Sequence, residues 1–439
     1  MLQNRTIQNE SSKIVIQWPQ KILLMLAIIF GLVYLLFTLT SIYYSPSIMP
    51  YLVTHAGVYI APDIIVGVLF LFFCVLYLIL FFVTRTSNIT QRQFKNALLL
   101  STIFIVVLLM SVPFLSVDLY AYVLRSQITN AYSVNPYEVS PGDLGYTSMI
   151  TWPDEVIRYG PLNTLLNSGL QKISGFSLAA GVFVFRCANI IVLFACAFLL
   201  YRIAQRVVPQ YARSAVLLFL WNPFVLIEGV QNAHNDLYVL LFILAALYCI
   251  VIKRYIVSIV MLTLGFLFKF SPALLLPLPF MLIGREALSV NKKIQKIGIG
   301  LGIIIVLLVV AYLPYGNFIN NLTDVQSYSE VNQLTAPRQA LKAIVEFVAP
   351  DSMAKRVTSY AYWIVFGICF VVILTRGKLR TDSSIIQKSF WILLVAFFLV
   401  DGKFNIWYLL WLFPLVLLFR DTRYHIIIIF LTFYGFYFI

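Results

Sequence analysis

Long apolar runs are the feature that most constrains what this chain can fold into. Hydrophobic residues make up 61% of its 439 residues and charged residues only 11%, and the mean hydropathy is +0.92. A soluble protein of this size needs a more charged exterior, so lipid is the solvent that fits. Backbone groups in lipid must bond within the chain, and these runs are too continuous for alternating barrel strands. The sequence therefore predicts an all-α, polytopic transmembrane protein.

A transmembrane helix needs about 20 apolar residues, and we expect about thirteen such spans. They lie near residues 21–41, 62–84, 96–116, 179–201, 212–230, 235–252, 255–269, 271–284, 297–315, 359–375, 388–400, 405–419 and 424–439. We expect residues 1–20, which are largely polar, to be a cytoplasmic tail without a cleavable signal sequence. Residues 21–439 are expected to form a single transmembrane domain.

The net charge of +14 indicates membrane orientation rather than nucleic-acid binding. With a cytoplasmic N-terminus, most of the 31 Lys and Arg residues fall in inside loops, while most of the 17 Asp and Glu residues fall outside. Two long loops, near 117–178 and 316–358, are then extracytoplasmic. Within the first, Leu119–Tyr132 is expected to be a short amphipathic helix at the membrane interface.

Asp118 is the first candidate for chemistry, because it directly follows a predicted span in the sequence SVDLYAY. A partly desolvated carboxylate at the membrane boundary can act as a general base. Capping of the following helix is the alternative explanation. Asn135–Tyr137 (NPY) and Arg158–Pro161 (RYGP) follow in the same loop. Their Asn-Pro and Gly-Pro pairs favour turns, and Arg158 could instead hold a phosphate.

The segment EGVQNAHNDLY, Glu228 to Tyr238, carries six hydrogen-bonding side chains where a tight hairpin needs fewer. Polar groups at membrane depth are costly and usually functional. His234 with Asp236 could bind a metal, but two ligands are too few and the five cysteines show no metal spacing. We therefore expect no metal and no cofactor.

Lys269 lies between two apolar runs on the predicted outer side, where the positive-inside rule disfavours it. It either reaches the lipid headgroups or faces an anion in a cavity. Asp401 and Lys403 form a similar outer hairpin that could also be a self-neutralising turn. All these charged residues fall on one side of the membrane, which suits an amphiphile with an anionic head.

The ordered motifs resemble a known superfamily. D-x-Y-x-Y, NPY, YGP, HND, K-x-S-P and a late Y-x-x-W-x-x-P (Tyr408, Trp411, Pro414) are similar to those of GT-C glycosyltransferases. The likeness is closest to family 87 and the polyprenyl-phosphate-mannose-dependent mannosyltransferases, and it covers about residues 110–415.

The resemblance implies transfer of a hexose, mannose above all, from a polyprenyl-phosphate donor to a glycan or lipid acceptor outside the cytoplasm. It implies that Asp118 is the base of an inverting reaction. Cationic residues would stabilise the leaving phosphate, and aromatic and amide residues would contact the sugar. The binding residues predicted in this way are Tyr120, Tyr122, Asn135, Tyr137, Arg158, Tyr159, His234, Asn235, Asp236, Lys269, Asp401 and Lys403.

Two features depart from the family pattern. The large outer loop follows the third predicted span rather than the first, and the usual paired acid is reduced to one because position 120 is Tyr. The second departure favours a metal-free mechanism. Two other functions remain open at this point. One is a transporter or flippase for a lipid-linked or anionic substrate, and the other a ligase or polymerase using an undecaprenyl-diphosphate glycan. Transporters usually place their sites near the midplane, whereas these polar residues gather at one face.

Overall fold

The structure is a computed structural model that describes residues 20–43, 62–86, 88–146, 152–316, 336–377, 381–400, 405–419, 421, 423–426 and 429. Described residues are helical wherever they form regular structure, which confirms the all-α prediction. The α-helices are α1 (Gln20–Tyr43), α3 (Pro62–Thr86), α4 (Gln91–Leu109), α5 (Asp118–Tyr132), α6 (Pro161–Ser174), α7 (Leu178–Val207), α8 (Ala212–Leu220), α9 (Pro223–Leu226), α10 (Asp236–Val251), α11 (Tyr255–Phe266), α12 (Pro277–Arg285), α13 (Val290–Tyr312), α15 (Ala336–Glu346), α16 (Asp351–Thr375), α17 (Asp382–Leu399) and α18 (Leu409–Val416).

Short helices of other types link them. They are η1 (Gly142–Leu144), η2 (Pro209–Tyr211), the π-helix η3 (Ile227–Gln231), η4 (Ser271–Leu275), η5 (Leu313–Tyr315) and η6 (Ile406–Tyr408).

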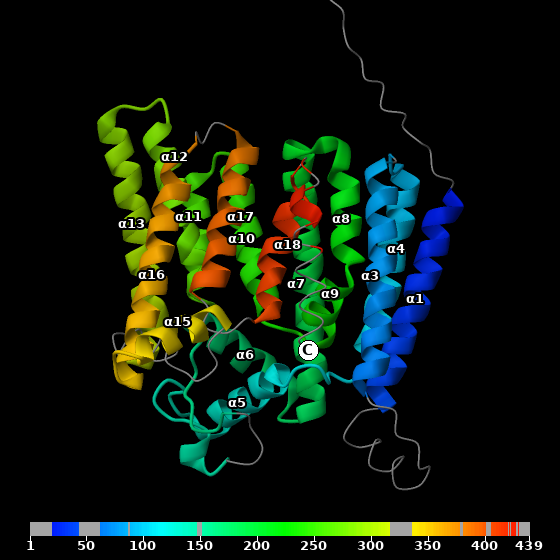
Figure 1. The fold of residues 1–439 in the computed structure, drawn as a ribbon, viewed down its shortest axis with the longest axis horizontal. Helices are drawn as coiled ribbons and strands as arrows, with labels where there is room; N and C mark the ends of the chain where they lie inside the picture. The colour runs from blue at the N-terminus through cyan, green and yellow to red at the C-terminus, as the bar shows by residue number, and fades with distance from the viewer. Residues whose placement is uncertain are drawn as a thin grey trace, which may run out of the picture.

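The long helices run side by side, and α5, α6 and α15 lie at one end of them (Figure 1). We call this the α5–α6 end. The helix predicted over Leu119–Tyr132 is confirmed as α5, which begins one residue earlier at Asp118. α5 and α6 lie beyond the ends of most long helices (Figure 1), and a polar contact joins them, because Asn130 on α5 donates to the Ser168 carbonyl on α6 at 3.0 Å.

The first three helices pack through aromatic rings. Trp221 is fully buried, and its indole nitrogen donates to the Ser101 hydroxyl at 2.9 Å. Phe30 and Phe104 meet that indole edge-on. The indole nitrogen is satisfied inside the packing, as a buried tryptophan requires. This contact joins α1 and α4 to the end of α8.

Seven described helices are long and apolar enough to cross a membrane, and a pair bent by 53°, Pro209–Leu220 with Pro223–Gln231, raises the number to at most eight. The predicted count of about thirteen spans is therefore not shown. Four of the predicted segments form shorter apolar helices: Asp236–Val251, Tyr255–Phe266, Ser271–Arg285 and Ile406–Val416. The last predicted span, 424–439, falls almost wholly outside the described residues.

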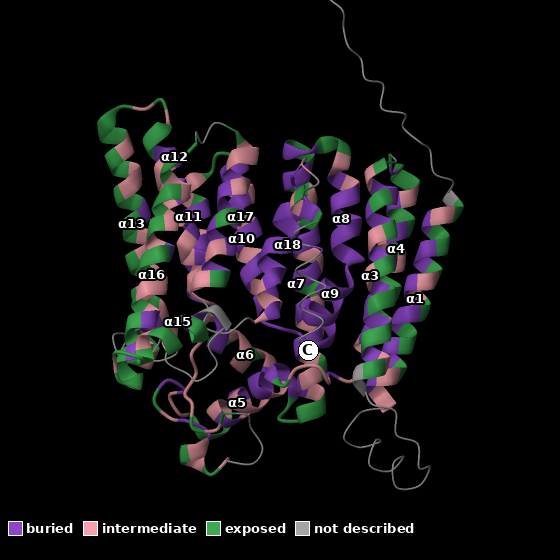
Figure 2. Ribbon diagram, viewed as in Figure 1, coloured by how far each residue is buried: buried purple, intermediate pink, exposed green. Residues whose placement is uncertain are grey.

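Burial varies widely among the apolar helices. In α13 and α16 only 11% of the span window is buried, as suits helices that face lipid. By contrast, every residue of α18 is buried, and so is nearly every residue of α8 (Figure 2). Hydropathy alone scores both kinds as apolar, so it cannot tell a lipid-facing span from a short helix inside the protein.

Candidate functional site

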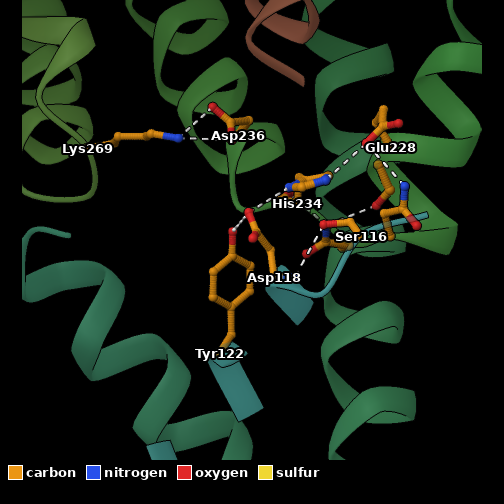
Figure 3. Close-up of polar contacts among 10 residues, drawn as sticks. Ser116, Asp118, Tyr122, Glu228, His234, Asp236 and Lys269 are labelled. Atoms are coloured by element: carbon orange, nitrogen blue, oxygen red, sulfur yellow. Dashed lines mark hydrogen bonds and ion pairs between the residues drawn. The ribbon is translucent and has the colours of Figure 1, made fainter. Parts of the chain in front are cut away.

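The candidate site lies at the α5–α6 end, where four separate segments meet (Figure 3). Asp118 begins α5, His234 lies between η3 and α10, Asp236 begins α10, and Lys269 follows α11. Trp407 and Tyr408 come from η6. The side chains of Asp118 and Lys269, distant in sequence, are thus on the same side of the protein.

His234 lies between two carboxylates. Its Nε2 is 3.0 Å from Glu228 Oε2, and its Nδ1 is 3.5 Å from Asp118 Oδ2. Burial by itself disfavours the charged imidazolium. The contacts and charges of Asp118 and Glu228 outweigh that effect and raise the pKa of His234 to about 9. His234 is therefore a cation at neutral pH.

Asp118 is 8% exposed and is the first residue of α5, so Val117 and not Asp118 occupies the N-cap position. Burial favours its neutral form. The His234 contact and charge, the charge of Lys269 and the Tyr122 hydroxyl together lower the pKa of Asp118 below its usual value. Tyr122 donates to Oδ2 at 3.4 Å, and His234 also meets Oδ2. Asp118 is thus an ionised carboxylate whose polar contacts concentrate on one oxygen.

Asp236 and Lys269 form a second buried group. The Lys269 ammonium lies 2.9 and 3.0 Å from the two oxygens of Asp236, whose side chain is fully buried. Three aromatic rings surround the ammonium, with ring centres 4.3 Å (Tyr408), 5.6 Å (Trp411) and 5.7 Å (Tyr159) from Nζ. A cation over ring faces is stabilised by their quadrupoles.

The backbone around His234 is unusual. Residues Ile227–Gln231 form a π-helix, and Ala233 takes a left-handed φ of 48°. Both features are found often at functional sites, where packing holds a strained backbone. Asn189 on α7 donates to the carbonyls of Gly229 and His234 at 2.9 and 3.1 Å. This amide fixes the loop on both sides of the strained residue.

Arg186 on α7 binds the backbone of the π-helix and of the end of α4. Its guanidinium donates to the carbonyls of Val230 at 3.0 Å and Ser111 at 2.7 Å, and also to Leu108 and Leu109 at the end of α4. The carbonyls at a helix C-terminus have no partners within the helix, and an arginine satisfies them well. In the sequence Arg186 is only a charge within a predicted span, and its anchoring role is not visible there.

The RYGP motif acts partly through backbone shape. A Cβ at Gly160 would lie 2.1 Å from the carbonyl oxygen of Leu267, so only glycine fits there. The Gly160 and Leu162 amides donate to Phe268 and Leu267 at 3.2 and 2.9 Å. The turn is thereby fixed against the chain just before Lys269. Arg158 pairs with Glu155 at 3.2 Å.

Three other predicted side chains are engaged by nearby groups. Tyr120 donates to the Pro113 carbonyl at 2.9 Å, and Asn135 donates to the Tyr315 carbonyl at 2.9 Å. Tyr137 donates to the Tyr159 carbonyl at 2.9 Å. Through these hydrogen bonds each of the three side chains stabilises the backbone of a neighbouring segment.

The remaining predictions differ in outcome. Asn235 is buried beside His234, and its amide atoms have no hydrogen-bond partner among the described residues. Asp401 and Lys403 lie outside the described residues. Across the described ranges no group of three or more His, Cys, Asp or Glu side chains is arranged to hold a metal ion.

Trp407 is the site residue that sequence reasoning missed. Its ring stacks on the His234 imidazole at 4.4 Å between centres and 13° between planes. The available signal was its position next to Tyr408 in the late aromatic motif. Glu228 was visible as a member of the polar segment, but its pairing with His234 was not.

Fold and site together define a multi-pass helical membrane protein with a buried ionic site at one end. The sequence model of a family described as "Alpha-(1->6)-mannopyranosyltransferase, N-terminal domain", the MptA/B family, matches residues 22–285, more than half of the chain. The chain therefore belongs to this family and is a mannosyltransferase, which takes a mannose donor and an acceptor. The resemblance to polyprenyl-phosphate-mannose-dependent GT-C enzymes is confirmed at this level. No curated protein and no solved structure matches the chain.

Proposed function

We propose that the protein transfers mannose from a polyprenyl-phosphate mannose to a glycan or lipid acceptor at the extracytoplasmic face, with inversion and with Asp118 as the base. The α5–α6 end would then be the extracytoplasmic end, and the N-terminus cytoplasmic. The observation that carries the proposal is the Asp118 carboxylate, buried yet kept ionised beside His234 and Lys269. A base must be deprotonated before it can accept the acceptor's proton.

The reaction is a single displacement. The acceptor hydroxyl oxygen attacks the anomeric carbon of mannose, and its proton passes to Asp118. The bond between that carbon and the phosphate oxygen breaks, and the polyprenyl phosphate leaves with the electron pair. The family name specifies an α product, so inversion requires a β-linked mannosyl phosphate as donor.

Lys269 is the proposed partner of the leaving phosphate. Its ammonium is only 13% exposed at the side chain and is fixed by Asp236. Charge that is already in place in a poorly hydrated site stabilises a developing anion without reorganisation. His234 would add a second cation close to Asp118. The rings of Tyr122 and Tyr159, which meet edge to face at 5.8 Å, offer surfaces for the sugar.

Asp118→Asn tests the proposal. The substitution keeps the side-chain shape but removes the base, so kcat should fall about 10²- to 10⁴-fold. Transfer is measured with a synthetic polyprenyl-phosphate mannose and α-(1→6)-mannobiose, using purified protein in lipid nanodiscs. Asp143→Asn is the matched control, because Asp143 lies in the same outer loop and only accepts hydrogen bonds from Ser140. Wild-type turnover by a folded Asp118→Asn protein would remove Asp118 from the base role.

A further inference from the structure

α15 carries its charged and its apolar side chains on different faces. Lys342 and Glu346 lie one turn apart on one face, where their side chains pair at 2.7 Å. Ala340 and Ile344 lie one turn apart on another face, and both are exposed. A helix divided in this way is typical of a boundary between water and an apolar phase.

The apolar face continues into the turn that joins α15 to α16. Ile344 is 63% exposed, and Phe347 and Val348 are each 88% exposed. The turn is still wound like a helix, because the amides of Phe347 and Val348 donate to the carbonyls of Ile344 and Val345 at 3.4 and 3.1 Å. Single exposed apolar side chains are common on soluble proteins, whereas a cluster of large ones marks an interaction surface. We call Ala340, Ile344, Phe347 and Val348 the apolar surface of α15.

Arg338 fixes which face of α15 points outward. Its side chain is 1% exposed and donates to the carbonyl of Leu399 and, at 3.3 Å, to that of Val400, at the end of α17. Its guanidinium also lies 4.6 Å from the centre of the Tyr362 ring on α16. A helix turns by about 100° per residue, which puts Arg338 on the side away from Ile344. The apolar surface therefore cannot rotate into the protein without breaking the Arg338 contacts.

α16 indicates what covers this surface. Its span window is only 11% buried, as expected for a helix that faces lipid. Five apolar or aromatic side chains recur along one face of α16 at steps of three or four residues, and each is between 39% and 63% exposed. They are Met353, Val357, Tyr360, Ile364 and Ile368. Because this stripe begins at the turn that carries the apolar surface of α15, the two exposed surfaces are continuous along the chain, and we expect lipid on both.

We propose that α15 is an interfacial helix, whose apolar surface binds lipid acyl chains in the leaflet at the α5–α6 end. Its charged face lies at the level of the lipid headgroups. There Lys342 also pairs with Asp351 at 2.7 Å, and Lys355 pairs with the same carboxylate at 2.8 Å. Since α15 lies at the same end of the bundle as α5 and α6 (Figure 1), it holds that end at the membrane surface. The inference does not depend on the role of Asp118.

Spin labelling tests where the apolar surface lies. Ile344→Cys, Phe347→Cys and Val348→Cys are made singly in a chain whose five native cysteines are replaced by alanine. Each labelled protein is placed in nanodiscs of phosphatidylcholine and phosphatidylglycerol, and thermal unfolding checks its fold. Oxygen concentrates in lipid and a nickel chelate stays in water. The ratio of oxygen to nickel collision rates should therefore be several-fold higher at these positions than in Glu346→Cys, the control on the charged face.

Two results would overturn the proposal. Equal collision ratios on both faces would place α15 in water. Low collision rates with both probes at all three apolar positions would mean that protein covers the surface, either a second copy or another segment of this chain.

A second measurement needs no replacement of the native cysteines. Phe347→Trp is made in the otherwise wild-type chain, and its emission is compared with that of the seven native tryptophans. Lipids brominated on their acyl chains should quench the added emission. They should quench that of Gln339→Trp much less, because Gln339 precedes Glu346 by about two turns and shares the charged face. Equal quenching of the two variants, or none in Phe347→Trp, would contradict insertion of α15 into the leaflet.

Discussion

Two ionic groups lie side by side at the α5–α6 end, and they differ in charge. Asp118, His234 and Glu228 form one group, in which one imidazolium is shared by two carboxylates. Asp236 and Lys269 form the other, with one carboxylate for one ammonium inside aromatic rings. In their charged forms the first group carries one net negative charge and the second none. A leaving phosphate is therefore expected mainly at Lys269, because two carboxylates already balance the charge of His234.

The difference in charge suggests that the two groups have different roles in catalysis. The negative group is suited to accept a proton, and its central member titrates with a pKa of about 9. The neutral group keeps a fixed cation that can exchange part of its pairing with Asp236 for a phosphate oxygen. Substitutions in and around the two groups should therefore change different kinetic parameters, and the variants below test the comparison.

After Asp118→Asn, the largest effect is expected from Lys269→Met, which removes the cation but keeps an unbranched side chain. We expect kcat/KM for the donor to fall about 10²-fold, as when one preorganised donor is lost from a site. The measurement is initial rate against donor concentration in nanodiscs. Lys296→Met is the control, because Lys296 is also ion-paired, with Glu286 at 2.6 Å.

Asp236→Asn decides whether the Lys269 effect is catalytic or structural. Lys269→Met leaves Asp236 as a buried, unpaired charge, which destabilises a protein by itself. Asp236→Asn keeps the ammonium and should cost much less activity. Equal losses in both variants, with equal drops in melting temperature, would mean that the pair serves only stability.

A smaller, pH-dependent effect is expected from Glu228→Gln. Glu228 and Asp118 are the charged groups in contact with His234, and the Trp407 ring covers its face. Removing one carboxylate lets the pKa of His234 fall from about 9 toward its ordinary value. His234 is charged below its pKa, so the basic limb of the pH–rate profile should move to lower pH. At about pH 8.5 the loss should reach about tenfold, with less loss below pH 6.5.

The stability of the wild-type protein should depend on the protonation of His234. Because folding raises the pKa of His234, its contribution to stability is complete below pH 6.5 and is lost as the pH rises through about 9.

Glu286→Gln is the control for Glu228→Gln, because it makes the same substitution in a different ion pair, that of Lys296. A basic limb that stays in place in Glu228→Gln would show that Glu228 does not act through His234.

The smallest effect is expected from Tyr408→Leu. The Tyr408 ring is the nearest to the Lys269 ammonium, at 4.3 Å. A cation–π contact of this kind contributes about 0.5–2 kcal/mol, so kcat/KM for the donor should fall roughly two- to thirtyfold. Tyr248→Leu is the control, because that ring lies 5.8 Å from Arg202 near the far end of α10. A loss as large as that of Lys269→Met would place Tyr408 in direct contact with substrate.

Sequence reasoning reached the site through unusual polar residues. Asp118, His234, Asp236 and Lys269 stood out because polar groups among apolar runs are costly. The sequence did not predict which of these side chains pair with each other, because spacing along the chain does not show which segments lie side by side in the fold. His234 and Asp236 are two residues apart, yet they serve different groups, because the turn into α10 points them at Asp118 and Lys269 respectively.

The predicted span count is not shown for a related reason. Segments such as α10 and α18 are as apolar as the longer candidate spans but are short helices with no exposed residue. The periodicity of an amphipathic helix is absent when every face is buried, so the sequence offers nothing that distinguishes protein from lipid around it.

The sequence by itself determined that this chain forms membrane helices, because its composition is apolar and backbone groups in lipid must form hydrogen bonds within the chain. It also determined that the polar residues are concentrated in a few segments. Only the tertiary structure decided the environment of each charge. Arg186 fixes the end of α4 to η3, Gly160 allows the outer loop to approach Leu267, and these contacts bring four segments together. Interactions between ionised side chains depend on distance and burial, and folding sets both.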